Sequence, residues 1–175
     1  METHFGQVEE ILGGWREALG EAFPAYRNHV YRVLHFAFAL RECHGEEREK
    51  MIIAASFHDL GIWTANTYDY LAPSISLARD YLRDTGRENW VAEIDLIIEF
   101  HHKFRAIKTS GLAETFRRAD WIDVSKGLLR FGLPRETIRT ILKAFPNAGF
   151  HRELVRLTRE EFKKHPLNPL PMMKW

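Results

Sequence analysis

Apolar residues recur along this chain at intervals of three and four, the spacing that places them on one face of a helix. Prolines and glycines separate the apolar blocks, and no block alternates with the period of two that is typical of a strand. The pattern predicts helices over residues 6–19, 25–43, 46–62, 70–84, 88–104, 110–131, 134–145 and 148–164. We therefore expect an all-α fold, a single-domain helical bundle of about seven to eight helices.

The C-terminal segment, residues 165–175, breaks the helical pattern. Pro166, Pro169 and Pro171 each lack a backbone N–H and fix an extended dihedral angle, so a helix cannot continue through them. The Leu, Met and Trp residues of the segment favour a strap that packs over the domain, with a partner-binding segment as the alternative. We predict one domain over residues 1–164 and a strap over residues 165–175.

Composition supports one folded domain without pointing to a polyanionic partner. The chain has 175 residues, 45% of them hydrophobic, which is enough for a core. It has 25 Lys and Arg against 24 Asp and Glu, mixed along the sequence, so we expect no nucleic-acid polymer as a partner. The 12 Phe and five Trp residues would suffice for a homodimer interface, although a core of this size can use them all.

The cysteine count and the N-terminal sequence indicate a cytoplasmic protein. Cys43 is the only cysteine, so it can form neither an intramolecular disulfide nor a thiolate zinc cluster. The first ten residues lack the basic start and apolar run of a signal peptide, and no stretch approaches the roughly 18 apolar residues of a membrane span. We therefore expect a cytoplasmic location and no membrane partner.

Ionisable residues interrupt the apolar faces of four predicted helices. A buried carboxylate without a partner is costly, so it must be protonated or lie beside a cation. The residues concerned are His29 in 25–43, His58 with Asp59 in 46–62, His101 followed by His102 in 88–104, and Asp120 in 110–131.

Each of these residues alone has an ordinary structural explanation. A single His on an apolar face more often binds a backbone carbonyl, Asp59 could cap a turn near Gly61, and Asp120 could pair with Arg117. Each of the four helices would then need its own partner for a buried polar side chain, whereas one cation could bind all of these side chains. Imidazole nitrogens and carboxylate oxygens suit Mn, Fe, Co, Ni or Zn, and Mg more weakly. We expect one divalent metal ion.

His29, the adjacent pair His58 and Asp59, and the distant Asp120 form the pattern H…HD…D, and the chain resembles the HD-domain superfamily of metal-dependent phosphohydrolases. The resemblance covers about residues 25–130 and is carried by the segments 28–33, 55–61 and 118–123. It implies a helical domain of the HD type in which His29, His58, Asp59 and Asp120 bind one divalent metal. It also implies a phosphomonoester or phosphodiester substrate, often a nucleotide.

Two departures from the family pattern limit what the resemblance implies. Similar families with two metals have an additional histidine soon after the HD pair, and here none occurs between His58 and His101. This favours one metal, with His101 and His102 as a proton source or as donors to phosphate. The residues after Asp59 are Leu60, Gly61, Ile62 and Trp63, which cannot act as acids or bases, so substrate specificity does not carry over.

The sequence thus predicts a metal-dependent phosphohydrolase that acts on a small phosphate ester through a metal-activated water. Asp59 would also orient that water, Lys103 and Arg117 would bind phosphate, and Trp63 would stack on a base. Two alternatives remain open. One is a non-catalytic HD-type protein that binds a nucleotide or a partner, and the other is an iron-dependent HD-type oxygenase, less favoured because the second iron would lack a histidine.

Overall fold

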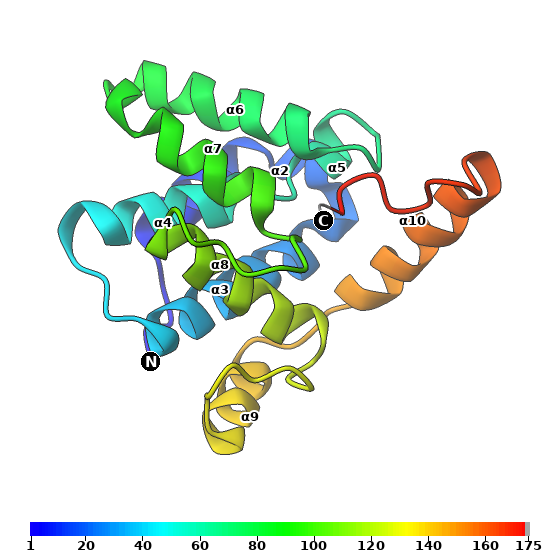
Figure 1. The fold of residues 1–175 in the computed structure, drawn as a ribbon. Coiled ribbons are helices and arrows are strands. Elements are labelled where there is room, and N and C mark those ends of the chain that lie inside the picture. The colour runs from blue at the N-terminus through cyan, green and yellow to red at the C-terminus, as the bar shows by residue number, and fades with distance from the viewer. Residues whose placement is uncertain (174–175) are drawn as a thin grey trace.

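The computed structural model describes residues 1–173 and is helical throughout, with no strand in that range (Figure 1). Lys174 and Trp175, the end of the predicted strap, lie outside the described residues. Eight helices have nine residues or more, which confirms the predicted all-α helical bundle. They are α1 (Gly6–Gly14), α3 (Phe23–Leu40), α4 (Gly45–Phe57), α6 (Leu71–Asp84), α7 (Val91–Phe100), α8 (Gly111–Val124), α9 (Arg135–Ala144) and α10 (Phe150–Lys164).

Short helical turns join some of these elements. They are α2 (Arg16–Leu19), α5 (Gly61–Thr64) and two 3₁₀ turns at Gly20–Ala22 and Glu88–Trp90. No helix of the described chain is long and apolar enough to cross a membrane.

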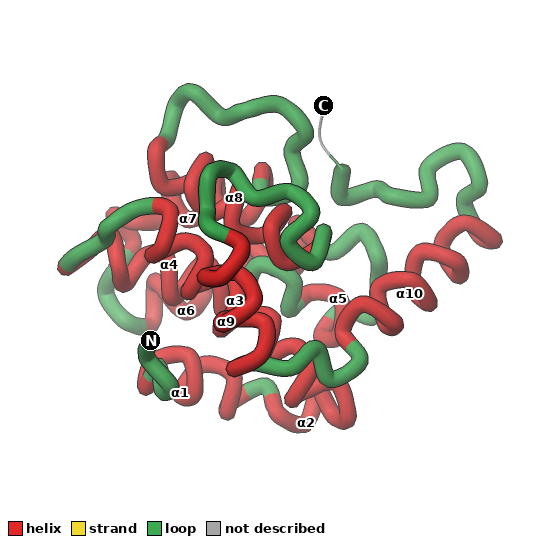
Figure 2. Tube along the Cα trace, turned by 90° about the horizontal axis from the view of Figure 1, so that it is seen from below, coloured by secondary structure: helices red, strands yellow, loops and turns green. Residues whose placement is uncertain are grey.

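Helix α3 forms the centre of the bundle and packs most extensively against α8. Its first turn contains Pro24, whose missing N–H costs nothing at a helix start. Val30, Val33, Leu34 and Ala37 are fully buried on it, because their spacing of three and four residues places them on one face of the helix. Helix α7 packs against both α6 and α8, and α10 lies at the edge of the molecule in both views (Figures 1 and 2). The α3–α8 pair therefore provides the frame for side chains that point into the bundle.

Several predicted helices end earlier than the apolar pattern suggested, α4 and α8 among them. The helix predicted over 46–62 ends at Phe57, and a turn leads into α5. The helix predicted over 110–131 ends at Val124, because Lys126 (φ +52°) and Gly127 (φ +78°) leave the right-handed helical region. A Cβ added to Gly127 would lie 2.6 Å from Ile138 Cγ2, so α9 approaches too closely for another residue. Leu128 consequently points to solvent, with 87% of its surface exposed.

The C-terminal segment, residues 165–173, turns back from the end of α10 toward α5 (Figure 1). Its Met172 is only 3% exposed and belongs to a small apolar cluster separate from the main core. We call this the strap cluster; its buried members are Ile62, Tyr68, Tyr70, Leu71 and Met172. Leu167, by contrast, is fully exposed. A single buried methionine therefore anchors the segment in this cluster.

Candidate metal centre

The structure brings six of the predicted side chains into one cluster: His29, His58, Asp59, His101, His102 and Asp120. Three overlapping groups of their ligand atoms each lie within 4.8 Å of one another. Five of the six residues are buried, and His102 keeps 14% of its side-chain surface exposed. Residues that are up to 91 positions apart in the chain thus meet in a closed, polar space within the bundle.

Two of the histidines are oriented in the same way, by a hydrogen bond to a backbone carbonyl at the end of a helix. His58 follows the last residue of α4, and His101 follows the last residue of α7. The Nδ1 atom of His58 lies 2.8 Å from the Ala55 carbonyl oxygen, and that of His101 lies 2.7 Å from the Ile98 carbonyl oxygen. A carbonyl oxygen can only accept, so Nδ1 carries the proton in both rings. The Nε2 atom of each neutral ring therefore turns a lone pair toward the cluster.

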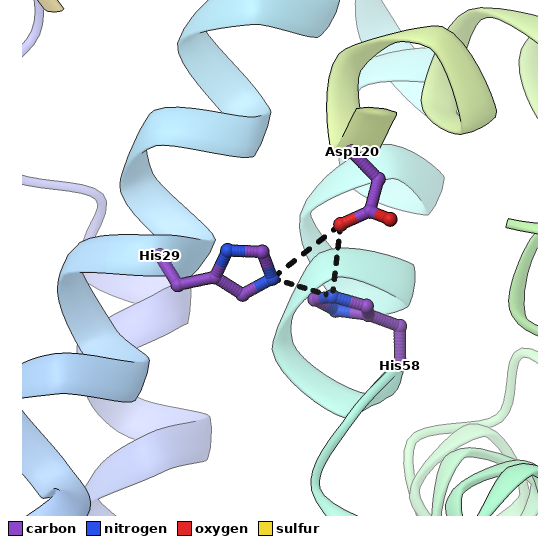
Figure 3. A group of neighbouring side chains, drawn as sticks. All are labelled: His29, His58 and Asp120. Carbon is purple, nitrogen blue, oxygen red and sulfur yellow. Dashed lines mark hydrogen bonds and ion pairs between the residues drawn. The ribbon is translucent and has the colours of Figure 1, made fainter. Parts of the chain in front are cut away.

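His29, in the second turn of α3, faces His58 across the cluster (Figure 3). Its Nδ1 atom donates to Asp123 Oδ2 at 2.7 Å, so its Nε2 atom also carries no proton when the ring is neutral. The two Nε2 atoms, of His29 and His58, lie 2.9 Å apart. Two lone pairs at that distance repel each other, and a proton or a cation must lie close to both.

The two carboxylates each divide their oxygen atoms between the two pairs of histidines. Asp59 Oδ2 lies 3.5 Å from His29 Nε2 and 3.3 Å from His58 Nε2, while Asp59 Oδ1 lies 3.3 Å from His101 Nε2. Asp120 Oδ1 lies 3.6 Å from His29 Nε2, while Asp120 Oδ2 lies 3.4 Å from His102 Nδ1. The cluster thus has a His29–His58 side and a His101–His102 side, joined by Asp59 and Asp120.

Several buried acceptors of the cluster have no hydrogen-bond donor in the described part of the chain. They are Asp59 Oδ1, His101 Nε2 and both carboxylate oxygens of Asp120. Each such atom costs about 1–3 kcal/mol if nothing satisfies it. All are acceptors that point to one place, and a divalent cation with a preference for nitrogen and oxygen ligands satisfies them together. The donor set therefore fits a metal ion.

The protonation of the cluster is consistent with a site that exchanges protons for a cation. Burial lowers the pKa of His29, but its hydrogen bonds to Asp123 and Asp59 outweigh this and raise the pKa to about 9. Burial raises the pKa of Asp120 to about 7, against the opposing effect of His101 and His29. Without a metal, these two groups hold protons near neutral pH that a cation would displace.

Asp123 and Arg32 support His29 and were not identified from the sequence. Arg32 binds both carboxylate oxygens of Asp123, with Nε 2.6 Å from Oδ1 and Nη2 2.8 Å from Oδ2. Burial raises the pKa of Asp123, but bonds to His29 and Arg32 hold it at about 2. A signal was present, because Arg32 lies three residues after His29 and Asp123 three residues after Asp120, on the same helix faces. The Asp123 carboxylate fixes the ring of His29 as an outer partner of a ligand does.

Aromatic side chains complete the surroundings of the centre. The ring of Phe150 stacks on His29 at a centroid distance of 4.0 Å. The hydroxyl of Tyr26 donates to the Ser56 carbonyl at 3.0 Å, and Tyr70 contacts His102. The sequence offers no signal for these contacts, because each joins elements that are distant in the chain.

The three residues predicted to bind substrate lie outside the cluster. Arg117 is buried, and its guanidinium donates to Glu114 at 2.8 Å and to the Lys103 carbonyl at 3.1 Å. The Lys103 ammonium lies 4.8 Å from the centre of the Phe100 ring, and the half-buried Trp63 ring packs 4.9 Å from Tyr26. Among the described contacts, none joins these three side chains to the six, and their role in substrate binding stays a prediction.

Comparison with known families extends the likeness beyond the region recognised in the sequence. A family model described as HD domain matches residues 26–168, which include α9 and α10 as well as the four metal-ligand candidates. No curated protein and no solved structure matches the chain significantly.

Proposed function

Since this chain belongs to the HD domain family, we propose that it is a metal-dependent phosphohydrolase acting on a small phosphate ester, with a nucleotide as the favoured example. The family is generally one of metal-dependent hydrolases. The observation that supports the proposal most is the set of buried acceptor atoms on Asp59, His101 and Asp120 that have no donor among the described residues.

In this proposal His29, His58, Asp59 and Asp120 hold one divalent cation, chosen from Mn, Fe, Co, Ni, Zn and Mg. Such an ion, when bound, lowers the pKa of water and neutralises charge on a phosphoryl group. The Asp123 carboxylate keeps the His29 lone pair directed inward, and the Ala55 carbonyl does the same for His58. These outer contacts leave both rings ready to bind without rearrangement.

The protein groups would divide the acid and base work between the two sides of the cluster. Asp59 orients the attacking water. His101 can donate to a phosphoryl oxygen only as an imidazolium, because its Nδ1–H is used on the Ile98 carbonyl. His102 is the most exposed of the six side chains, so substrate would enter on its side. For Arg117 to bind phosphate, its guanidinium would first have to leave Glu114.

The test is metal content and turnover on a panel of phosphate esters, before and after His58→Ala and Asp120→Ala. His44→Ala is the matched control, since its imidazole is 79% exposed and, among the described residues, pairs only with Glu42. We expect both site variants to lose metal and turnover and the control to keep both. Unchanged metal binding in both site variants would overturn the site, and hydrolysis that survives complete metal removal would overturn the mechanism.

The same measurements separate the two rival functions. Binding of a nucleotide seen by thermal shift, without turnover on any ester, would replace the enzyme with a non-catalytic binding protein. Oxygen consumption by protein that holds more than one iron per chain would replace it with an oxygenase.

A further inference from the structure

The charged residues of the chain are balanced overall but segregated between two parts of it. Residues 1–125 contain 14 Lys and Arg against 20 Asp and Glu. Residues 126–164, which include α9 and α10, contain 10 Lys and Arg against 4 Asp and Glu. The net charge of +1 for the whole chain therefore hides a basic C-terminal part, and such an asymmetry attracts polyanions.

Basic side chains of this part gather along α10, where they line an open groove of about 630 Å³. We call it the basic groove; its charged lining residues are Lys126, Arg152, Arg156, Arg159 and Lys163, with Glu153 and Glu160. Arg156 is paired with both glutamates on its own helix. The other four basic side chains form no ion pair within the described part of the chain. They can therefore bind an anion from solution without giving up a partner.

The basic groove lies on the side of α10 that faces away from the bundle. On the inner side of the helix, Leu154 packs against the main core and Leu157 against the strap cluster. At about 100° per residue, Arg152, Arg159 and Lys163 lie on the opposite side of the helix. Helix α10 is at the edge of the molecule in both views, so this side is open to a partner (Figures 1 and 2).

Contacts at the start of α10 hold the basic groove in place. His151 Nε2 lies 3.1 Å from the carbonyl oxygens of Asp123 and Val124, at the end of α8. The neighbouring Phe150 is buried and stacks on His29. Lys126 follows α8 directly, so the two parts of the chain that line the groove are fixed relative to each other. A partner therefore binds a surface that is already formed, which lowers the entropic cost of binding.

The chemistry of the groove favours a single-stranded polynucleotide over other polyanions. From Arg152 to Lys163 the helix rises about 16 Å, enough to contact several backbone phosphates. Val155 and Phe162, which are 49% and 56% exposed, lie at the border of the basic side chains. An aromatic ring beside a basic groove is the arrangement on which successive bases stack. Insertion into a membrane surface would need a continuous apolar face, and that face of α10 is turned to the bundle.

We propose that the basic groove binds a single strand of RNA or DNA, with backbone phosphates on its four unpaired basic side chains and a base against Phe162. This differs from the expectation drawn from the overall charge balance, which averages over an acidic and a basic part. None of the six side chains of the candidate metal centre lines the groove. The inference therefore stands apart from the proposed hydrolysis and needs no turnover for its test.

The first test measures binding of short fluorescent oligo(U) and oligo(dT) strands by anisotropy over a range of salt concentrations. For wild type, the slope of log K against log salt should be about −3, as expected for four phosphate contacts on a single strand. A variant that combines Arg152→Gln, Arg159→Gln and Lys163→Gln should reduce this slope by about 2 and weaken binding about 100-fold near 0.1 M salt. Binding of either strand supports the proposal, and the tighter of the two identifies the sugar.

The matched control removes the same charge from α9. It combines Arg135→Gln, Arg139→Gln and Lys143→Gln, at exposed positions of the same basic part that do not line the groove. We expect this variant to keep the wild-type slope and affinity. An equal loss of binding in both triple variants would show attraction by net charge alone and would overturn the proposal.

The second test separates stacking from charge. Phe162→Ala should weaken binding by about 5- to 100-fold and leave the salt slope unchanged, because a stacked ring releases no counterion. Leu167→Ala, at a fully exposed apolar position outside the groove, should change neither quantity. Failure of wild type to bind either strand at low salt would overturn the proposal. Binding to phosphatidylserine vesicles without binding to either strand would replace the polynucleotide with a membrane surface.

Discussion

Two kinds of packing surround the candidate metal centre, and they differ in the contacts that hold them together. At the α3–α8 interface, His29 binds Asp123, Asp123 binds Arg32, and Arg32 donates to the Phe145 carbonyl, all of them buried. On the side of His102, the C-terminal segment contributes Met172 to the apolar strap cluster, whose member Tyr70 contacts His102.

The difference indicates separate roles for the two sides. Opening the α3–α8 side would break the buried hydrogen bonds and ion pairs that Asp123 makes with His29 and Arg32. Lifting Met172 exposes apolar surface but breaks no charged pair. The polar side is suited to holding ligands in place, and the apolar side is suited to admitting a substrate.

The largest effect should come from breaking the polar side with Asp123→Ala. This variant leaves Arg32 buried without its carboxylate, and we expect the free energy of unfolding to fall by about 3–5 kcal/mol in urea titrations. Metal affinity should weaken by about 10- to 100-fold, because His29 loses the partner that orients it.

The control for this prediction is Asp95→Ala. Asp95 pairs with Arg79, whose side chain is 57% exposed, so its loss should cost less than about 1 kcal/mol. Equal stability of the Asp123 variant and wild type would contradict the assignment of Asp123 as the buried anchor.

On the apolar side, Met172→Ala should have a smaller and different effect. Loss of a buried methionine should cost about 2 kcal/mol, the low end for core positions, because the strap cluster is peripheral. We expect a chelator to strip bound metal faster from this variant while equilibrium metal affinity stays the same. Leu167→Ala, at a fully exposed position of the same segment, should change neither quantity. Unaltered stripping in Met172→Ala would show that access lies elsewhere.

The smallest expected effect is the change in metal affinity for each unit of pH, which depends on the protons that the cluster holds. The pKa of His29 is raised to about 9, so below that pH a metal ion must displace its proton. Metal affinity should therefore rise with pH by roughly tenfold per unit for each proton released, and level off above about pH 9. Calorimetry in buffers of different ionisation enthalpy measures this release at pH 7; binding without proton release would contradict it.

The same pKa values predict how the metal-free protein responds to pH. A raised pKa means that the folded state binds protons more tightly, so the stability from His29 is fully present below its unfolded value near 6.5 and is lost as the pH rises through about 9. Asp120, with a pKa raised to about 7, acts in the same direction. The melting temperature of the metal-free protein should fall between pH 6.5 and 9, whereas that of the metal-loaded protein should fall less.

The sequence by itself determined the helical class and predicted the four ligand candidates His29, His58, Asp59 and Asp120. Helical spacing placed His29, His58, His101 and Asp120 on apolar faces, because a buried face repeats every three to four residues. The eight predicted blocks correspond to the eight longer helices for the same reason. The choice of His29, His58, Asp59 and Asp120 as the ligands came from the resemblance to the HD-domain superfamily.

Only the tertiary structure decided where α4 and α8 end, and which side chains support the ligands. Helix α8 stops where Ile138 of α9 crowds Gly127, and Asp123 binds a guanidinium that lies 91 positions away in the chain. Tyr70 reaches His102 from the start of α6, and Phe150 covers His29 from α10. The periodicity of one helix shows which face is buried, but the partner on that face depends on how the helices are placed against one another, which is a property of the packed bundle.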